Sequence, residues 1–310
     1  MADRYFVNSS KVNEMQIVRI ERNKERIVFI GSQIHRPIND AKSLAGSIVL
    51  DVNKWSKMMF VHQGLREVIL NKEKNWTVLL CIKGYTKRQI ETIKKYFNNI
   101  FKSDGTQTVR KIKEITNLEE ILCYINHGDE ITNRRLYMIR KLVFYCHGNV
   151  RGLSPWMPSV PTVLDDYIDK TFVEKIEKYA FGPSSEIYSY ACRSGLGNLK
   201  IDKDARGMNP MPEKSLAQAF ADITGATVYA YLRRTWYGDS LLNSNERRQV
   251  ENLSKISDYE KIKNNYLYEI WKTKKYEIDG EILYPKGARH PVRADETPIG
   301  VPSGMKIFLG

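Results

Sequence analysis

The sequence predicts an α/β protein built on a mostly parallel β-sheet with helices on both faces. Apolar runs of strand length, rich in Val, Ile, Tyr and Phe and closed by small residues, recur along the chain. Segments with the helical spacing of apolar residues lie between these runs, and such alternation is typical of α/β folds. The order strand, helix, strand, helix, strand over residues 142–234 predicts a βαβαβ unit with right-handed crossovers.

Three strands are expected in the amino-terminal half, at residues 26–32, 76–84 and 108–115. The first two are apolar runs that end in glycine, and the third alternates apolar and charged residues like a half-exposed strand. A helix with a Thr86 cap should follow the second strand, because apolar residues recur at helical spacing up to Phe97. Residues 117–128 predict a short helix between an Asn cap and a glycine stop. Residues 35–59 give mixed signals, for a helix or for a helix followed by a strand.

Two buried strands in the second half end in chemically reactive residues. The run LVFYCHG ends at His147 and Gly148, and the run EIYSYACRSG reaches Cys192. Parallel neighbouring strands bring their carboxyl ends to the same edge of the sheet, where ligands bind in open α/β proteins. A thiol needs a base to become a good nucleophile, and histidine usually supplies it. The pattern therefore predicts a cysteine hydrolase, with Cys146 on the opposite face as a structural residue.

The connections around these strands have their own signals. Residues 149–164 are rich in Gly, Pro and Ser and predict a loop over the site. Residues 165–182 predict an amphipathic helix that ends at Gly182-Pro183, and residues 213–225 predict a helix closed by glycine. Residues 226–234 predict another buried strand.

Composition excludes several classes of protein. No apolar run is long enough to span a membrane, and the amino terminus lacks the apolar core of a secretory signal peptide. Four cysteines are too few for a disulfide scaffold, and the five histidines lack metal-ligand spacing, so no structural zinc is expected. Cys81 and Cys123 lie inside apolar patterns and are expected to be buried, inert thiols.

The charge balance favours acidic partners. The chain has 49 Lys and Arg against 36 Asp and Glu, a net charge of +13. These residues are spread along the chain, and no zinc finger, RNP-like motif or helix-turn-helix signature accompanies them. A solvated basic surface is therefore favoured over a dedicated nucleic-acid site.

The strand ending His-Gly and the strand ending Ala-Cys resemble those of the caspase-like cysteine peptidases. Cys192 lies 45 residues after His147, near the spacing of roughly 50 in caspases. The run ACRSG resembles the caspase Q-A-C-[RQG]-G signature, with Tyr190 in place of Gln and Ser194 before the glycine. The following run SLAQAFADITGATVYAY resembles caspase-like domains of bacterial toxins and secretion-system effectors, and the resemblance covers about residues 135–238.

This resemblance implies a thiol protease that works with a His147–Cys192 dyad and without a required cofactor. The oxyanion would be held by the backbone N–H groups of Gly148 and Cys192. Some toxin domains of this class are switched on by an anionic inositol phosphate, which the basic charge of this chain would permit. The expected partner is a protein or peptide substrate. The protein is expected to be a bacterial effector or toxin that is either cytoplasmic or exported without a cleavable signal peptide.

Two substrate preferences stay open. Arg193, Arg233 and Arg234 would suit an acidic side chain before the scissile bond, through a bidentate pair. The acidic pair Asp165-Asp166 would suit Lys or Arg instead. The loop residues Trp156 and Trp236 are candidates for apolar pocket walls and equally for ordinary packing.

The expected division of the chain is a caspase-like α/β domain over residues 1–242 and an extension over residues 243–310. In the first, residues 135–238 form the core and strands within 26–115 complete the sheet. The second is charged and mostly helical at first, then rich in Gly and Pro, and is either a surface cap or a docking arm. A catalytically inactive binding module for acidic partners or nucleic acid is the main alternative function. A further alternative is another thiol hydrolase, or an acyltransferase, that uses the same two residues. A serine α/β-hydrolase is disfavoured, because the sequence has no Gly-x-Ser-x-Gly motif.

Overall fold

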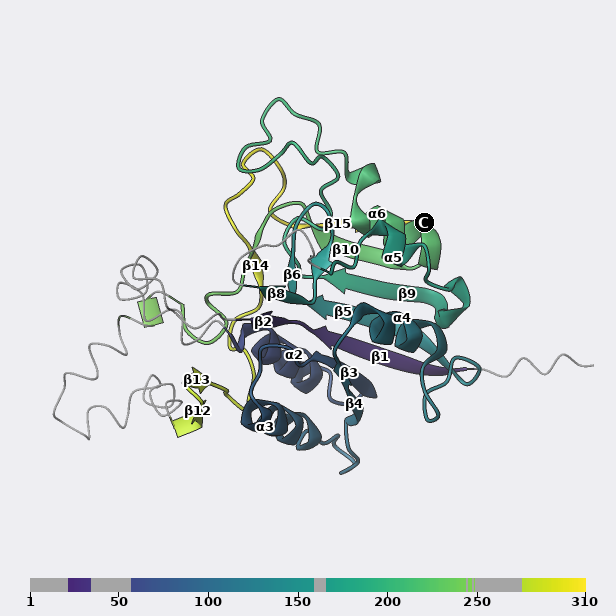
Figure 1. Cartoon of the computed structure of the whole chain (residues 1–310), viewed down its shortest axis with the longest axis vertical. Coiled ribbons are helices and arrows are strands. Elements are labelled where there is room, and N and C mark those ends of the chain that lie inside the picture. Colours follow the sequence, from purple (N-terminus) through teal and green to yellow (C-terminus); the bar gives the residue numbers. More distant parts are fainter. Residues whose placement is uncertain (1–21, 35–56, 159–165, 244, 247, 249–274) are drawn as a thin grey trace, which may run out of the picture.

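A seven-stranded sheet in the order β15-β10-β9-β5-β1-β3-β4 forms the centre of the protein (Figure 1). The computed structural model describes residues 22–34, 57–158, 166–243, 245–246, 248 and 275–310. Every neighbouring pair of strands in the sheet is parallel except β10 and β15. The predicted α/β fold with a mostly parallel sheet is confirmed.

The strands follow the apolar runs of the sequence. They are β1 (Asn23–Ile30), β3 (Trp76–Cys81), β4 (Val109–Ile115), β5 (Tyr137–Tyr145), β9 (Phe181–Ser189), β10 (Thr227–Tyr231) and β15 (Met305–Phe308). Strand β3 and the carboxyl halves of β1 and β5 are buried on both sides, because helices cover both faces of the sheet there. The predicted parallel neighbours β5, β9 and β10 lie side by side.

In the described part of the chain, five helices cover the two faces of the sheet. They are α2 (Met59–Leu70) and α3 (Lys87–Asn98) on one face, and α4 (Leu118–His127), α5 (Lys170–Val173) and α6 (Leu216–Thr224) on the other. The predicted Thr86 cap is present as a full capping box with Gln89, and Asn117 caps α4. Ser215 caps α6, so this helix starts after the short 3₁₀ turn η3 (Pro212–Lys214).

Helix α2 has no counterpart in the sequence-based predictions. It begins where the ambiguous segment 35–59 ends, and residues 35–56 lie outside the described residues. Its first two turns are buried on nearly every side, with His62 and Gln63 among the apolar residues. A helix covered all round lacks the one-sided apolar stripe by which amphipathic helices are recognised.

The predicted helix over residues 165–182 is wrong. Ile168 exchanges backbone hydrogen bonds with Leu153, so the chain is extended there and α5 begins only after its cap at Asp169. The pair Gly182-Pro183 does not end a helix but lies in β9. The register between β5 and β9 shifts at that point, and proline is tolerated in such an irregularity because no ladder bond is required of it.

The four cysteines differ in exposure. Cys81 is buried, as predicted, and Cys146 is buried as well. The prediction for Cys123 is wrong, because this residue is exposed. The buried face of α4 is formed by Ile121, Tyr124 and Ile125, and Cys123 lies on the other side of the helix.

The carboxyl-terminal residues return to the central sheet. Most of the expected helical stretch after residue 243 lies outside the described residues. The described part, residues 275–310, forms the hairpin β12 (Glu277–Ile278) and β13 (Glu281–Ile282), then β14 (Arg293–Ala294), and finally β15. Because β15 pairs with β10, the end of the chain completes the sheet. Among the described residues, no helix has the length and apolarity needed to cross a membrane.

Candidate active site

His147 and Cys192 lie at the carboxyl edge of the sheet, at the ends of neighbouring parallel strands. His147 belongs to β6 (His147–Gly148), which continues β5 and forms a hairpin with β7 (Leu153–Ser154). Cys192 lies in the turn after β9. The two strand ends are in contact, because a Cβ built on Gly148 would lie 2.8 Å from Ala191 Cβ and 3.2 Å from Cys192 O. Only glycine allows so close an approach.

Three aromatic rings connect α2 with this edge. The His147 ring packs edge-on against Phe60 of α2, with ring centroids 4.8 Å apart. Phe60 packs in the same manner against Tyr237, again at 4.8 Å. The Tyr237 hydroxyl donates a hydrogen bond of 3.0 Å to Tyr190 O, two residues before Cys192. His147 therefore lies on the α2 face of the sheet.

Cys146 lies on the opposite face. It is fully buried in the core between the sheet and helices α4, α5 and α6, where burial raises the pKa of its thiol. Gly31 packs against it so closely that a Cβ there would lie 2.6 Å from Cys146 Cβ. The structural role predicted for Cys146 agrees with this position.

Thr235 is the residue that contacts the sulfur of Cys192. It belongs to β11 (Thr235–Trp236), and its backbone N–H donates a hydrogen bond of 3.2 Å to Cys192 Sγ. Its hydroxyl lies 3.3 Å from the same sulfur. The Cys192 thiol can in turn donate to Thr235 O, at 3.7 Å. Thr235 was missed by the sequence analysis, because it only follows a predicted strand and belongs to no motif.

The backbone around the dyad has an N–H group turned away from the hairpin. Leu153 exchanges both of its backbone hydrogen bonds with Ile168, at 3.1 and 2.9 Å. Leu153 and its partner in β6, Gly148, therefore form a non-hydrogen-bonded pair. The Gly148 N–H points away from β7. Arg193, directly after Cys192, has a positive φ of 56°. Such backbone conformations in residues other than glycine concentrate at functional sites.

The three arginines of the predicted pocket have different partners. Arg193 Nη1 and Arg234 Nη2 both contact Asp202 Oδ1, at 3.1 and 2.8 Å. The hydrogen bond from Arg234, supported by Arg193, lowers the pKa of Asp202. Arg233 instead donates to the backbone oxygens of Val301 and Glu296, so it is held by the carboxyl-terminal segment.

The other predicted pocket residues are not gathered at one place. Asp165 lies outside the described residues, and Asp166 is exposed. Trp156 is 6% exposed and belongs to the core, with Lys83 Nζ 4.2 Å from its ring centroid. Trp236 is 38% exposed and lies directly after Thr235, so it is the tryptophan closest in sequence to the Cys192 contact.

No metal centre is apparent in the described part of the chain, where no three His, Cys, Asp or Glu side chains are arranged to hold an ion. Comparison of the chain with protein-family models, with curated proteins and with solved structures finds no match in any of the three. The resemblance to caspase-like peptidases therefore depends on the motifs alone and stays a prediction.

Proposed function

We propose that the protein is a cysteine endopeptidase of caspase-like type, with Cys192 as nucleophile and His147 as general base. The observation that carries this proposal is the contact of Gly148 with Ala191 and Cys192 at the carboxyl edge of the sheet. It joins the ends of the two strands that carry the imidazole and the thiol. Adjoining backbone segments allow an imidazole to come within hydrogen-bond reach of a thiol, which is the arrangement that activates cysteine nucleophiles.

The reaction uses these groups in two steps. His147 removes the thiol proton, and the thiolate attacks the scissile carbonyl carbon to form a tetrahedral oxyanion. The imidazolium then gives its proton to the leaving amine as the carbon–nitrogen bond breaks, which leaves a thioester on Cys192. Water, deprotonated by His147, attacks the thioester and releases the new carboxylate and the free thiol. The Gly148 N–H, which points away from β7, and the Cys192 N–H are the proposed oxyanion donors.

We further propose that the residue before the scissile bond is acidic. Arg193 and Arg234 flank the Cys192–Thr235 contact in sequence, and their guanidinium groups converge on the carboxylate of Asp202. A carboxylate on a peptide has the same chemistry as the Asp202 side chain and can replace it there. The rival basic preference depends on Asp165 and Asp166, of which only the exposed Asp166 is described.

The test is covalent labelling of the full chain with peptidyl acyloxymethyl ketones that carry Asp, Lys or Leu before the reactive group. Wild type is compared with Cys192→Ala, His147→Ala and the matched control Cys123→Ala, because Cys123 is also an accessible thiol. The proposal predicts rapid labelling by the Asp reagent that is lost in the first two variants and kept in the control.

Two results would contradict the proposal. Slow labelling of several cysteines that does not depend on His147 would exclude the dyad and favour a binding module. Labelling at Cys192 that prefers Lys over Asp would leave the dyad in place and exclude the acidic pocket.

A further inference from the structure

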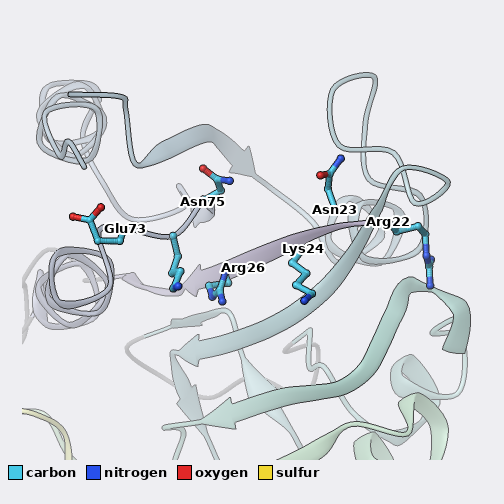
Figure 2. A pocket seen from close by; sticks show the side chains of 7 residues that line it. Arg22, Asn23, Lys24, Arg26, Glu73 and Asn75 are labelled. Carbon is cyan, nitrogen blue, oxygen red and sulfur yellow. The ribbon is translucent and has the colours of Figure 1, made fainter. Parts of the chain in front are cut away.

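The amino-terminal edge of the sheet, opposite the edge with Cys192, carries a basic hollow. It has a volume of about 340 Å³ and is lined by the cations Arg22, Lys24, Arg26 and Lys74 and the amides Asn23 and Asn75. The single carboxylate in its lining, Glu73, accepts hydrogen bonds from the backbone N–H and the hydroxyl of Ser103. In the view of Figure 2, the side chains of Lys24 and Arg26 extend in a different direction from the Glu73 carboxylate.

The cations of this hollow are only partly compensated. Burial lowers the pKa of Arg26, and the nearby Arg140 lowers it further, against a smaller opposite effect of Glu186. Lys102 adds another positive charge at the rim, where its Nζ lies 2.6 Å from Asn75 Oδ1. Cations held together in this way repel one another, and an anion in the hollow would relieve the repulsion.

A second hollow adjoins the first. It has a volume of about 400 Å³ and is lined by His127, Asn133, Arg134, Arg135 and Tyr179. Arg22 connects the two hollows, because its Nη1 donates to Arg134 O at 3.1 Å and to Tyr179 O at 2.7 Å. The positive charges thus extend from Lys74 and Arg26 through Arg22 to Arg135.

Tyr179 supplies an aromatic surface in the second hollow. The side chain is 50% exposed, although Arg22 binds its carbonyl and its hydroxyl donates a hydrogen bond of 3.0 Å to Asn126 O. The nearby Glu177 carboxylate raises the pKa of the Tyr179 hydroxyl. The residue is therefore held at its backbone carbonyl and at its hydroxyl, and it remains half exposed to solvent.

We propose that these two hollows form a binding track for single-stranded nucleic acid. The cations would contact successive phosphates, and an unpaired base would stack on Tyr179. A concave track with one fixed aromatic ring suits an unpaired strand, whereas a duplex keeps its bases stacked inside. The track lies at the opposite edge of the sheet from Cys192, so it does not depend on the proposed peptidase activity.

The test is binding of fluorescein-labelled 12-mer oligothymidylate and oligouridylate to the full chain, followed by anisotropy at several salt concentrations. Neutralisation of four or five phosphates predicts a slope of log K against log salt of about −3. Lys24→Gln with Lys74→Gln should make the slope less negative by about 1.4. The matched control, Lys200→Gln with Lys306→Gln, removes two exposed lysines elsewhere and should keep the wild-type slope.

Stacking is tested separately at Tyr179. Tyr179→Ala should weaken binding by about 5-fold or more, because base stacking on an aromatic ring is lost. Tyr179→Phe keeps the ring and should bind like wild type. Absence of binding, an equal effect of the control lysines, or equal binding of poly-glutamate with the same dependence on Lys24 and Lys74 would overturn the proposal. The same variants should label at Cys192 at the wild-type rate. This measurement separates failure of the nucleic-acid proposal from failure of the peptidase proposal.

Discussion

Three groups of Thr235 contact the Cys192 sulfur: its backbone N–H at 3.2 Å, its hydroxyl at 3.3 Å and its carbonyl oxygen at 3.7 Å. Thr235→Val keeps the shape and the N–H but removes the hydroxyl. We expect labelling at Cys192 to slow about 2- to 10-fold, because one such hydrogen bond contributes about 0.5–1.5 kcal/mol. Thr235→Ser keeps the hydroxyl and should label at nearly the wild-type rate. Equal slowing in both variants would show that the hydroxyl has no part in positioning the sulfur.

His62 makes the stability of the fold depend on pH. It is fully buried in α2, its Nε2 accepts a hydrogen bond from Tyr284 N, and burial lowers its pKa from 6.5 to about 3. Between these two pKa values the unfolded chain binds a proton that the folded chain does not, so stability decreases as the pH falls below about 6.5. From pH 7 to pH 5 this residue should account for about 2 kcal/mol of lost unfolding free energy.

Urea unfolding at the two pH values measures this dependence. His62→Gln, which retains a hydrogen-bond acceptor for Tyr284, should lose less stability between pH 7 and pH 5 than wild type. His127→Gln removes an exposed histidine at the end of α4 and should keep the wild-type dependence. An unchanged dependence in His62→Gln would assign the acid sensitivity to other groups.

At this scale the sequence pointed to the proposed dyad more clearly than to the residues around it. His147 and Cys192 were singled out because each ends an apolar run that predicts a strand, and both strands exist. Thr235 acts partly through its backbone N–H, which any residue except proline carries. The sequence did not distinguish Arg233 from Arg234. The structure does, because the Arg233 side chain donates to the backbone oxygens of Val301 and Glu296.

At the scale of elements, the approach of β6 to the turn after β9 depends on Gly148. In Gly148→Ala the new Cβ would lie 2.8 Å from Ala191 Cβ, so the two strand ends must separate. We expect labelling at Cys192 to fall by more than about 10-fold, since small displacements of catalytic groups are costly. Ala191→Gly in the same chain removes the clashing methyl group and should restore part of the rate. Unaltered labelling in Gly148→Ala would mean that this contact does not position the dyad.

The buried ion pair between Glu25 and Arg134 links β1 to α4 and to the segment before β5. Glu25 accepts hydrogen bonds from Arg134, from Thr77 Oγ1 and from the Tyr124 hydroxyl, and both charged side chains are almost fully buried. Glu25→Ala should lower the unfolding free energy by about 3–5 kcal/mol, because the Arg134 charge is left buried without its partner. Glu114→Ala breaks the exposed pair with Lys94 and should cost less than about 1 kcal/mol in the same urea titration. Similar losses in the two variants would contradict the role of burial.

The elements that were mispredicted share a physical reason. Apolar periodicity identifies a strand or helix when one side faces the core and the other faces solvent. The first two turns of helix α2 are buried nearly all round, and no helix was predicted over its residues. The segment after Asp169 has helical periodicity. Between the Ile168–Leu153 bridge and the start of β9 at Phe181 it forms only the short helix α5 and a 3₁₀ turn at Lys178–Ala180. Tertiary pairing outweighed the local preference there.

At the scale of the whole molecule, strand β15 packs against the turn that carries Cys192. Phe308 of β15 is 2% exposed, and a Cβ on Gly195 would lie 3.0 Å from its ring, three residues after Cys192. No sequence pattern linked these residues, because the pairing of β15 with β10 joins segments far apart along the chain. The segment expected as a cap or docking arm therefore contains a strand of the central sheet.

This packing predicts that the last strand affects both stability and reactivity. Phe308→Ala should lower the unfolding free energy by about 3–5 kcal/mol, as expected for loss of a buried aromatic side chain, and should also slow labelling at Cys192. Ile307→Ala, on the other face of the same strand and 55% exposed, should cost less than about 1 kcal/mol and leave labelling unchanged. Urea titration and labelling on the same samples separate the two effects. If Phe308→Ala loses stability but labels at the wild-type rate, β15 closes the sheet without supporting the turn that carries Cys192.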